Sequence, residues 1–124
     1  MFEKVNLQHV RSSWGFEVKW WNRATQIYVE YREDDDILLY DNTQNATGLG
    51  YPLLSIMPDY IQHWLPPFAD ETVGLGDKKR IIENMAAALD FMGVSTNVLD
   101  SRGGVIAEFH EHEWVWKAEE WQNA

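Results

Sequence analysis

The segment from Glu108 to Glu113 carries the residues best able to bind a metal, two histidines among three glutamates. Side chains alternate across an extended strand, so His110 and His112 would lie on one face and offer two imidazoles to a metal ion. The other histidines are His9 and His63, so the third ligand would be a carboxylate. Alternating charge is equally typical of a solvated edge strand, where it prevents pairing with other sheets. We expect the edge strand, with no metal and no cofactor, and keep His110 and His112 as the alternative.

Three consecutive aspartates, Asp34, Asp35 and Asp36, form a second cluster. Hard cations bind clustered carboxylates, but a calcium loop alternates its ligands and needs a glycine at its turn. Between residues 30 and 41, six acidic side chains and one basic one leave a net charge of −5, half of the total of −10. Two interpretations remain open: a solvated hairpin tip, or an acidic surface that faces a basic partner.

A second acidic stretch near the C-terminal end contains aromatic residues. Between residues 108 and 121, five glutamates and one lysine leave a net charge of −4 and are interleaved with Trp114, Trp116 and Trp121. Tryptophan offers a large rigid contact and binds Arg or Lys over its ring, while carboxylates attract the same cations. The two stretches predict a partner-binding set of Glu33, Asp34, Asp35, Asp36, Glu111 and Glu113 for electrostatic attraction, with Trp116 as the anchor. The alternative is that Trp114 and Trp116 face the core.

A basic turn runs against the acidic average. Lys78, Lys79 and Arg80 would lie in the first turn of a helix, where positive charge opposes the helix dipole. Such a helix terminus can hold a phosphate. Because carboxylates are abundant in the chain, we expect these cations to pair with acidic residues of the same protein instead.

Hydrophobic periodicity predicts the elements that position these side chains. Alternation predicts strands over 16–21 and 25–32, joined through Asn22 and Arg23, and further strands over 37–40, 51–57, 94–99 and 105–109. Helical spacing of apolar residues predicts the main helix over 77–92, with Asp77 as its N-cap and Gly93 at its end. Pro58 favours a short helix over 59–64. Residues 110–121 fit a continued strand, or residues 115–121 fit a helix. The predicted class is α+β, with an antiparallel sheet of about six strands packed against the main helix.

The composition limits the class of protein. A chain of 124 residues, 45% of them hydrophobic, can bury a core as a single domain over 1–124, and the lack of cysteine excludes disulfides and thiolate chemistry. No phosphate loop, nucleophile elbow or zinc helix occurs, so we do not expect an enzyme. No apolar run reaches membrane-spanning length and no secretory signal is present, so we expect a cytoplasmic protein. A net charge of −10 disfavours nucleic acid and membrane and favours a basic partner.

Between Ile27 and Leu99 the order of features resembles the small acidic immunity proteins of bacterial polymorphic-toxin and contact-dependent growth inhibition systems. The matching features are the stretch from Ile27 to Leu39, then Trp64, Pro66 and Pro67, and then Arg80, Ile81, Ile82, Asn84, Ala88 and Leu89. The chain looks most like immunity protein family seventy-four. The resemblance implies that the protein binds one cognate toxin in the cytosol, often a nuclease, and covers its active site. It implies no particular contact residues.

Other classes of function remain open beside this one. A phage-type inhibitor that mimics nucleic-acid charge would spread carboxylates along one whole face, whereas here they concentrate in two sequence blocks. A small metal-binding protein would use His110 and His112. For the immunity protein we expect a one-to-one complex with a basic toxin domain, formed by a chain that is otherwise a monomer or a weak homodimer.

Overall fold

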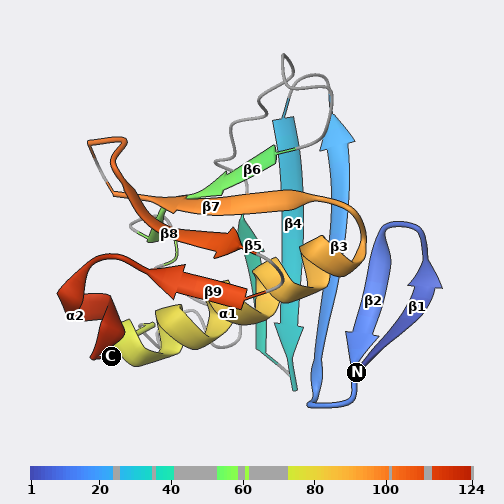
Figure 1. Cartoon of the computed structure of the whole chain (residues 1–124). Helices are drawn as coiled ribbons and strands as arrows, with labels where there is room; N and C mark the ends of the chain where they lie inside the picture. The colour runs from blue at the N-terminus through green and yellow to red at the C-terminus, as the bar shows by residue number, and fades with distance from the viewer. Residues whose placement is uncertain are drawn as a thin grey trace.

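The computed structural model describes residues 1–23, 26–34, 36–40, 53–58, 61, 73–100, 102–110 and 113–123. Within these ranges nine strands form two sheets, accompanied by one long and one short helix (Figure 1). The α+β class is confirmed, but the expectation of a single antiparallel sheet of about six strands is wrong. Of the short helix predicted over 59–64, only Ile61 lies within the described residues, and its side chain is buried.

The first sheet joins five antiparallel strands in chain order: β1 (Phe2–Asn6), β2 (His9–Ser12), β3 (Phe16–Arg23), β4 (Gln26–Glu33) and β5 (Asp36–Tyr40). Alternation correctly predicted the inward faces of β3 and β4, where Phe16, Val18, Val29 and Tyr31 are buried. Arg23 pairs with Gln26, so the chain reverses after Arg23 and not at Asn22 and Arg23.

The second sheet has the order β6 (Leu53–Ile56), β7 (Ser95–Leu99), β8 (Val105–His110) and β9 (Glu113–Trp116). β6 pairs with β7 in parallel, while the other pairs are antiparallel. A parallel pair requires a crossover connection, and the long helix lies in it. β6, which lies within the strand predicted over 51–57, therefore belongs to the second sheet and pairs with a C-terminal strand.

The long helix α1 (Leu75–Phe91) holds the two sheets together. Its apolar stripe is buried as predicted, with Ile81, Ile82, Met85, Ala88 and Leu89 in one core that both sheets share. In Figure 1 the strands of the first sheet stand upright and those of the second run across the view. The short helix α2 (Glu119–Gln122) follows β9, so the segment 110–121 contains both a strand and a helix. None of the described helices has the length and apolar character that a membrane span needs.

The sequence predicted one end of α1 correctly and the other incorrectly. The helix begins after Gly74, not at Asp77, because the Gly74 carbonyl accepts the first helical bond from Lys78 N–H at 2.8 Å. The end at Gly93 is confirmed. Gly93 has a φ of +86°, and the bonds from Gly93 N–H to the Asp90 carbonyl and from Val94 N–H to the Leu89 carbonyl form a Schellman motif.

The variant Gly93→Ala is expected to lower the free energy of unfolding by about 1–2 kcal/mol, the cost of a left-handed conformation for a residue with a Cβ. Gly76→Ala is the matched control, since it lies inside α1 and, like Gly93, has open space where a Cβ would be. Alanine should leave stability unchanged there or raise it by up to about 1 kcal/mol. Urea denaturation measures both, and equal effects would contradict the assigned role of the positive φ.

Candidate partner-binding surface

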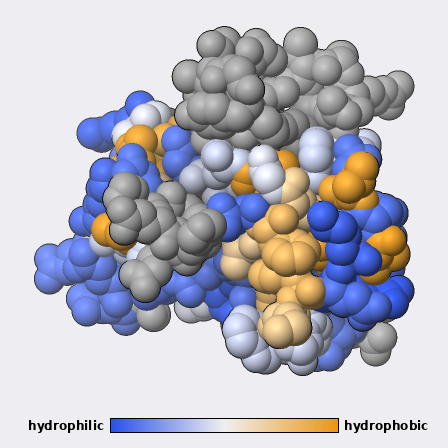
Figure 2. All heavy atoms as spheres, turned by 45° about the vertical axis from the view of Figure 1, so that its right-hand side comes forward, coloured by the Kyte–Doolittle hydropathy of each residue, from blue (hydrophilic) through white to orange (hydrophobic). Residues whose placement is uncertain are grey.

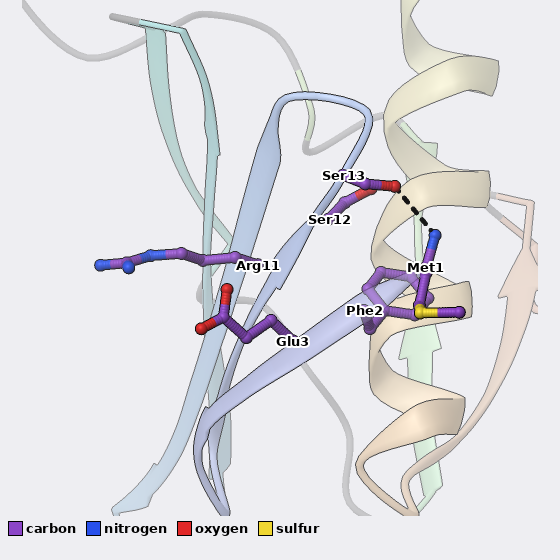
Figure 3. Close-up of a pocket in the computed structure, with 6 residues that line it drawn as sticks. All are labelled: Met1, Phe2, Glu3, Arg11, Ser12 and Ser13. Atoms are coloured by element: carbon purple, nitrogen blue, oxygen red, sulfur yellow. Dashed lines mark hydrogen bonds between the residues drawn. The ribbon is translucent and has the colours of Figure 1, made fainter.

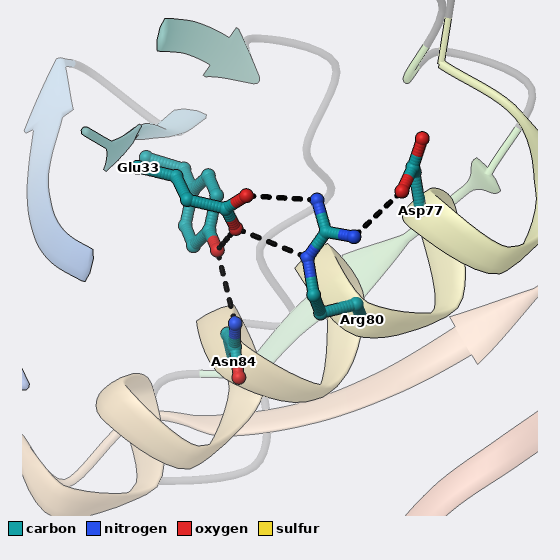
Figure 4. A network of polar contacts seen from close by, with 5 residues as sticks. Glu33, Asp77, Arg80 and Asn84 are labelled. Carbon is teal, nitrogen blue, oxygen red and sulfur yellow. Dashed lines mark hydrogen bonds and ion pairs between the residues drawn. The ribbon is translucent and has the colours of Figure 1, made fainter. Parts of the chain in front are cut away.

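A polar network ties the β4–β5 hairpin to the first turns of α1 (Figure 4). Arg80 donates to both carboxylate oxygens of Glu33, from Nη2 at 2.8 Å and from Nε at 3.1 Å. Its Nη1 donates to Asp77 Oδ1 at 2.6 Å. The prediction that the basic turn pairs within the chain is therefore confirmed for Arg80.

Tyr31 connects this network to the core. Its side chain is fully buried, and its hydroxyl donates to Glu33 Oε2 at 2.5 Å and accepts from Asn84 Nδ2 at 3.0 Å. Burial raises the pKa of Tyr31 above its usual value, and the hydrogen bond to Glu33 acts in the same direction. Burial alone would lower the pKa of Arg80, but its hydrogen bonds to Glu33 and Asp77 outweigh that effect and raise it. The network thus fixes both carboxylates while Tyr31 is neutral and Arg80 is charged.

The raised pKa of Tyr31 makes its contribution to stability sensitive to alkali. The contribution is complete below the unfolded value of 10.0 and is lost as the pH rises toward the higher folded value. At pH 8, Tyr31→Phe should therefore be less stable than the parent by about 1–2 kcal/mol, because Glu33 and Asn84 lose a partner. Urea denaturation should show this difference shrinking above about pH 10. Tyr28→Phe, on the outer face of the sheet, is the control, and a difference that stays constant with pH would contradict the assignment.

The acidic hairpin tip forms as predicted. Glu33 pairs with Asp36 across the β4–β5 turn, and Asp34 within the turn is exposed with a φ of +54°. Asp36 begins β5, and Asp35 lies outside the described residues. Glu33, only 25% exposed and already bonded to Tyr31 and Arg80, has little capacity left for a partner. Of the predicted hairpin residues, Asp34 is the one whose described side chain is open to a partner.

The sequence predicts Trp116 as the anchor for a partner, but Trp116 is only 8% exposed and therefore has little surface to offer one. Its indole Nε1 donates to Glu83 on α1 at 2.7 Å, and its ring stacks on Trp121 with centroids 5.0 Å apart. Lys79 Nζ lies 5.8 Å from the Trp116 ring centroid. The alternative, a tryptophan in the core, is the one that the structure supports.

The histidine segment is not one continuous strand. β8 ends at His110 and β9 begins at Glu113, and these two residues pair, so the chain reverses between them. Glu111 and His112 lie outside the described residues. Among the residues that the structure does describe, no three His, Cys, Asp or Glu side chains are grouped to hold a metal.

Both acidic sequence blocks meet α1 at its N-terminal end. Arg80 binds the hairpin tip, through Glu33. Lys79 binds α2, because its Nζ donates to the Gln122 carbonyl at 3.4 Å. Four exposed carboxylates lie on the segments that meet at this end of the helix, and we call them the α1 acidic surface: Asp34, Asp77, Glu119 and Glu120. Sequence reasoning missed three of them, since Asp77 was assigned as a cap and the two glutamates were counted only as part of a stretch.

One cavity among the described residues, of about 310 Å³, lies beside the N-terminal strand and is lined by Met1, Phe2, Glu3, Arg11, Ser12 and Ser13 (Figure 3). The Met1 ammonium donates to Ser13 Oγ at 3.0 Å, and Arg11 is bonded to Glu17 at 3.1 Å. The cavity holds one carboxylate, so it lacks the paired acid and base of many hydrolases.

In comparisons with protein-family models, with curated proteins and with solved structures, the chain matched none. The function of the protein is therefore inferred from the geometry of the α1 acidic surface.

Proposed function

We propose that the protein is an immunity protein that binds a cognate antibacterial toxin in a one-to-one complex and covers its active site. The supporting observation is that two acidic segments far apart in the sequence meet at one end of α1. A toxin with a basic surface fits this arrangement. A nuclease is the class that fits best, because its active site must carry cations to bind phosphate.

Arg80 makes one carboxylate of the α1 acidic surface suited to binding, because it holds Asp77 in place. Arg80 orients Glu33 and Asp77, yet Asp77 remains 52% exposed and can accept further hydrogen bonds. A surface whose side chains are already ordered loses less conformational entropy when it binds. The exposed carboxylates attract a basic protein over a distance and select it against acidic competitors.

Co-expression tests the proposal. The tagged protein is produced together with the polypeptide of the neighbouring upstream reading frame, and the complex is isolated at low and high salt. We expect a basic polypeptide to be recovered in equal amount, to dissociate as the salt concentration rises, and to arrest growth when it is expressed alone.

The competing classes of function have different outcomes in the same preparation. A protein that is recovered alone and carries a stoichiometric metal would contradict the immunity function and favour His110 and His112 as ligands. Metal analysis of the purified chain is the corresponding measurement.

A further inference from the structure

The end of α1 opposite to the acidic surface carries a groove that the proposed function has not used. The groove has a volume of about 570 Å³ and lies between the β1–β2 turn and the end of the helix. Its lining combines apolar and aromatic side chains with one cation: Leu7, Trp20, Phe91 and Met92 with Lys4, Gln8 and Gly93. In Figure 2, where the right-hand side of Figure 1 comes forward, apolar surface gathers between hydrophilic side chains.

Two apolar side chains of the groove are exposed to solvent. Leu7, in the hairpin turn, is 77% exposed although its side chain is apolar, and Phe91, at the last position of α1, is 46% exposed. Exposed aliphatic and aromatic side chains grouped in one concave site are typical of a binding surface. Phe2 packs against Phe91 with ring centroids 5.4 Å apart, so the aromatic wall is supported from behind.

The electrostatics of the groove favour a cation. The C-terminal end of a helix bears the negative end of its dipole, and the faces of aromatic rings attract positive charge. The structure already shows this preference, because Lys4 Nζ lies over the Phe91 ring at 5.7 Å from its centroid. A long aliphatic stem that ends in a cation thus fits both the apolar walls and the charge.

We propose that this groove binds a long cationic side chain, arginine or lysine, of the partner, and that Lys4 occupies the position until the partner displaces it. That the partner is the basic toxin rests on the proposed function. The two sites are compatible with one interface, because Asp77 and Phe91 are 14 positions apart and thus separated by only about 21 Å along the helix axis, within the width of a standard interface. The groove would supply the anchor that the buried Trp116 cannot.

A small probe tests the groove without any toxin. The ¹⁵N-labelled full chain is titrated at low salt with N-acetyl-L-arginine amide and, separately, with the neutral N-acetyl-L-norleucine amide. The reporter is the indole N–H signal of Trp20, identified by its loss in Trp20→Phe. We expect a saturable shift with the arginine probe and a binding constant about fivefold weaker with the neutral probe.

Two variants of the groove should change the binding constant in opposite directions. Phe91→Leu keeps an apolar wall without a π face, and should weaken binding of the arginine probe by about threefold. Lys4→Met removes the competing cation and should strengthen it by about threefold. Arg102→Met is the control, because it also removes one positive charge but lies in the β7–β8 turn.

The outcomes separate this inference from the proposed function. Three results would each overturn the cation site: equal binding of the two probes, weaker binding of the arginine probe to Lys4→Met than to the parent, or no saturable shift with the parent and with Lys4→Met. Toxin binding through the acidic surface would still stand in each case. If the arginine probe binds but co-expression recovers no basic polypeptide, the cation site would stand and its assignment to a toxin would be overturned.

Discussion

Replacement of Trp116 with alanine is expected to lower the free energy of unfolding by about 3–5 kcal/mol, the range for truncation of a large buried aromatic side chain. The loss has identifiable parts. The stack with Trp121 disappears, a cavity opens between β9 and α1, and Glu83 loses the indole donor at 2.7 Å. A half-buried carboxylate without its donor adds to the cost of the cavity.

Two controls make the Trp116 experiment specific. Trp14→Ala also removes a tryptophan, but from a side chain that is 80% exposed, and should change stability by less than about 0.5 kcal/mol. Trp116→Phe keeps an aromatic ring in the stack and loses the indole donor, so its cost should be intermediate. Urea denaturation followed by circular dichroism avoids the altered fluorescence. Equal costs for Trp14→Ala and Trp116→Ala would contradict the placement of Trp116 in the core.

The contacts of Trp116 explain why its burial could not be assigned from the sequence. Alternation from Glu113 to Trp116 shows that Trp114 and Trp116 share one face of a strand, but it does not show whether that face is covered. The cover comes from α1, through Glu83, and from Trp121 on α2. The Trp121 contact depends on where the chain turns after β9, and the Glu83 contact depends on how α1 packs against β9. The local pattern of the sequence left both open.

The elements that could be predicted are those in which apolar side chains alternate with polar ones, as in a strand, or recur at helical spacing, so that one face is buried. α1 has a continuous apolar stripe, and β3 and β4 alternate between buried and solvated positions. β1 has no such pattern, because its side chains are exposed from Glu3 to Asn6, so the N-terminal hairpin was not predicted. Nor does a strand sequence identify its neighbour, and the parallel pairing of β6 with β7 therefore had no local signal.

In the candidate site, too, the local features could be predicted and the long-range contacts could not. The acidic hairpin tip could be predicted because three aspartates interrupt two alternating runs, and internal pairing of the basic turn could be predicted from the excess of carboxylates. The specific pair, Arg80 with Glu33, joins residues 47 positions apart and needs the packing of α1 on the first sheet. Consequently the sequence predicted Glu33 as a partner contact, whereas its oxygens are taken up within the protein.

Removal of two charges from the α1 acidic surface, by Asp34→Asn with Glu119→Gln, should slow association with the basic partner by about tenfold at low salt. The dissociation rate should change much less, because exposed carboxylates act chiefly through long-range attraction. Stability should be preserved, since asparagine tolerates the positive φ of residue 34 and both side chains are exposed. Glu33 is left intact so that the Tyr31 and Arg80 contacts persist.

The matched control for this double variant removes two carboxylates elsewhere, by Glu3→Gln with Glu30→Gln on the outer face of the first sheet. Glu3 pairs across the strands with Arg11, and Glu30 with Lys19, on the side of the sheet turned away from the core. The control has the same net charge, so a purely global attraction would slow both proteins equally. Stopped-flow association at several salt concentrations distinguishes the two cases. A steering surface at α1 requires the Asp34 and Glu119 variant to be the slower one and to have the weaker salt dependence, and equal rates would assign the attraction to the total charge alone.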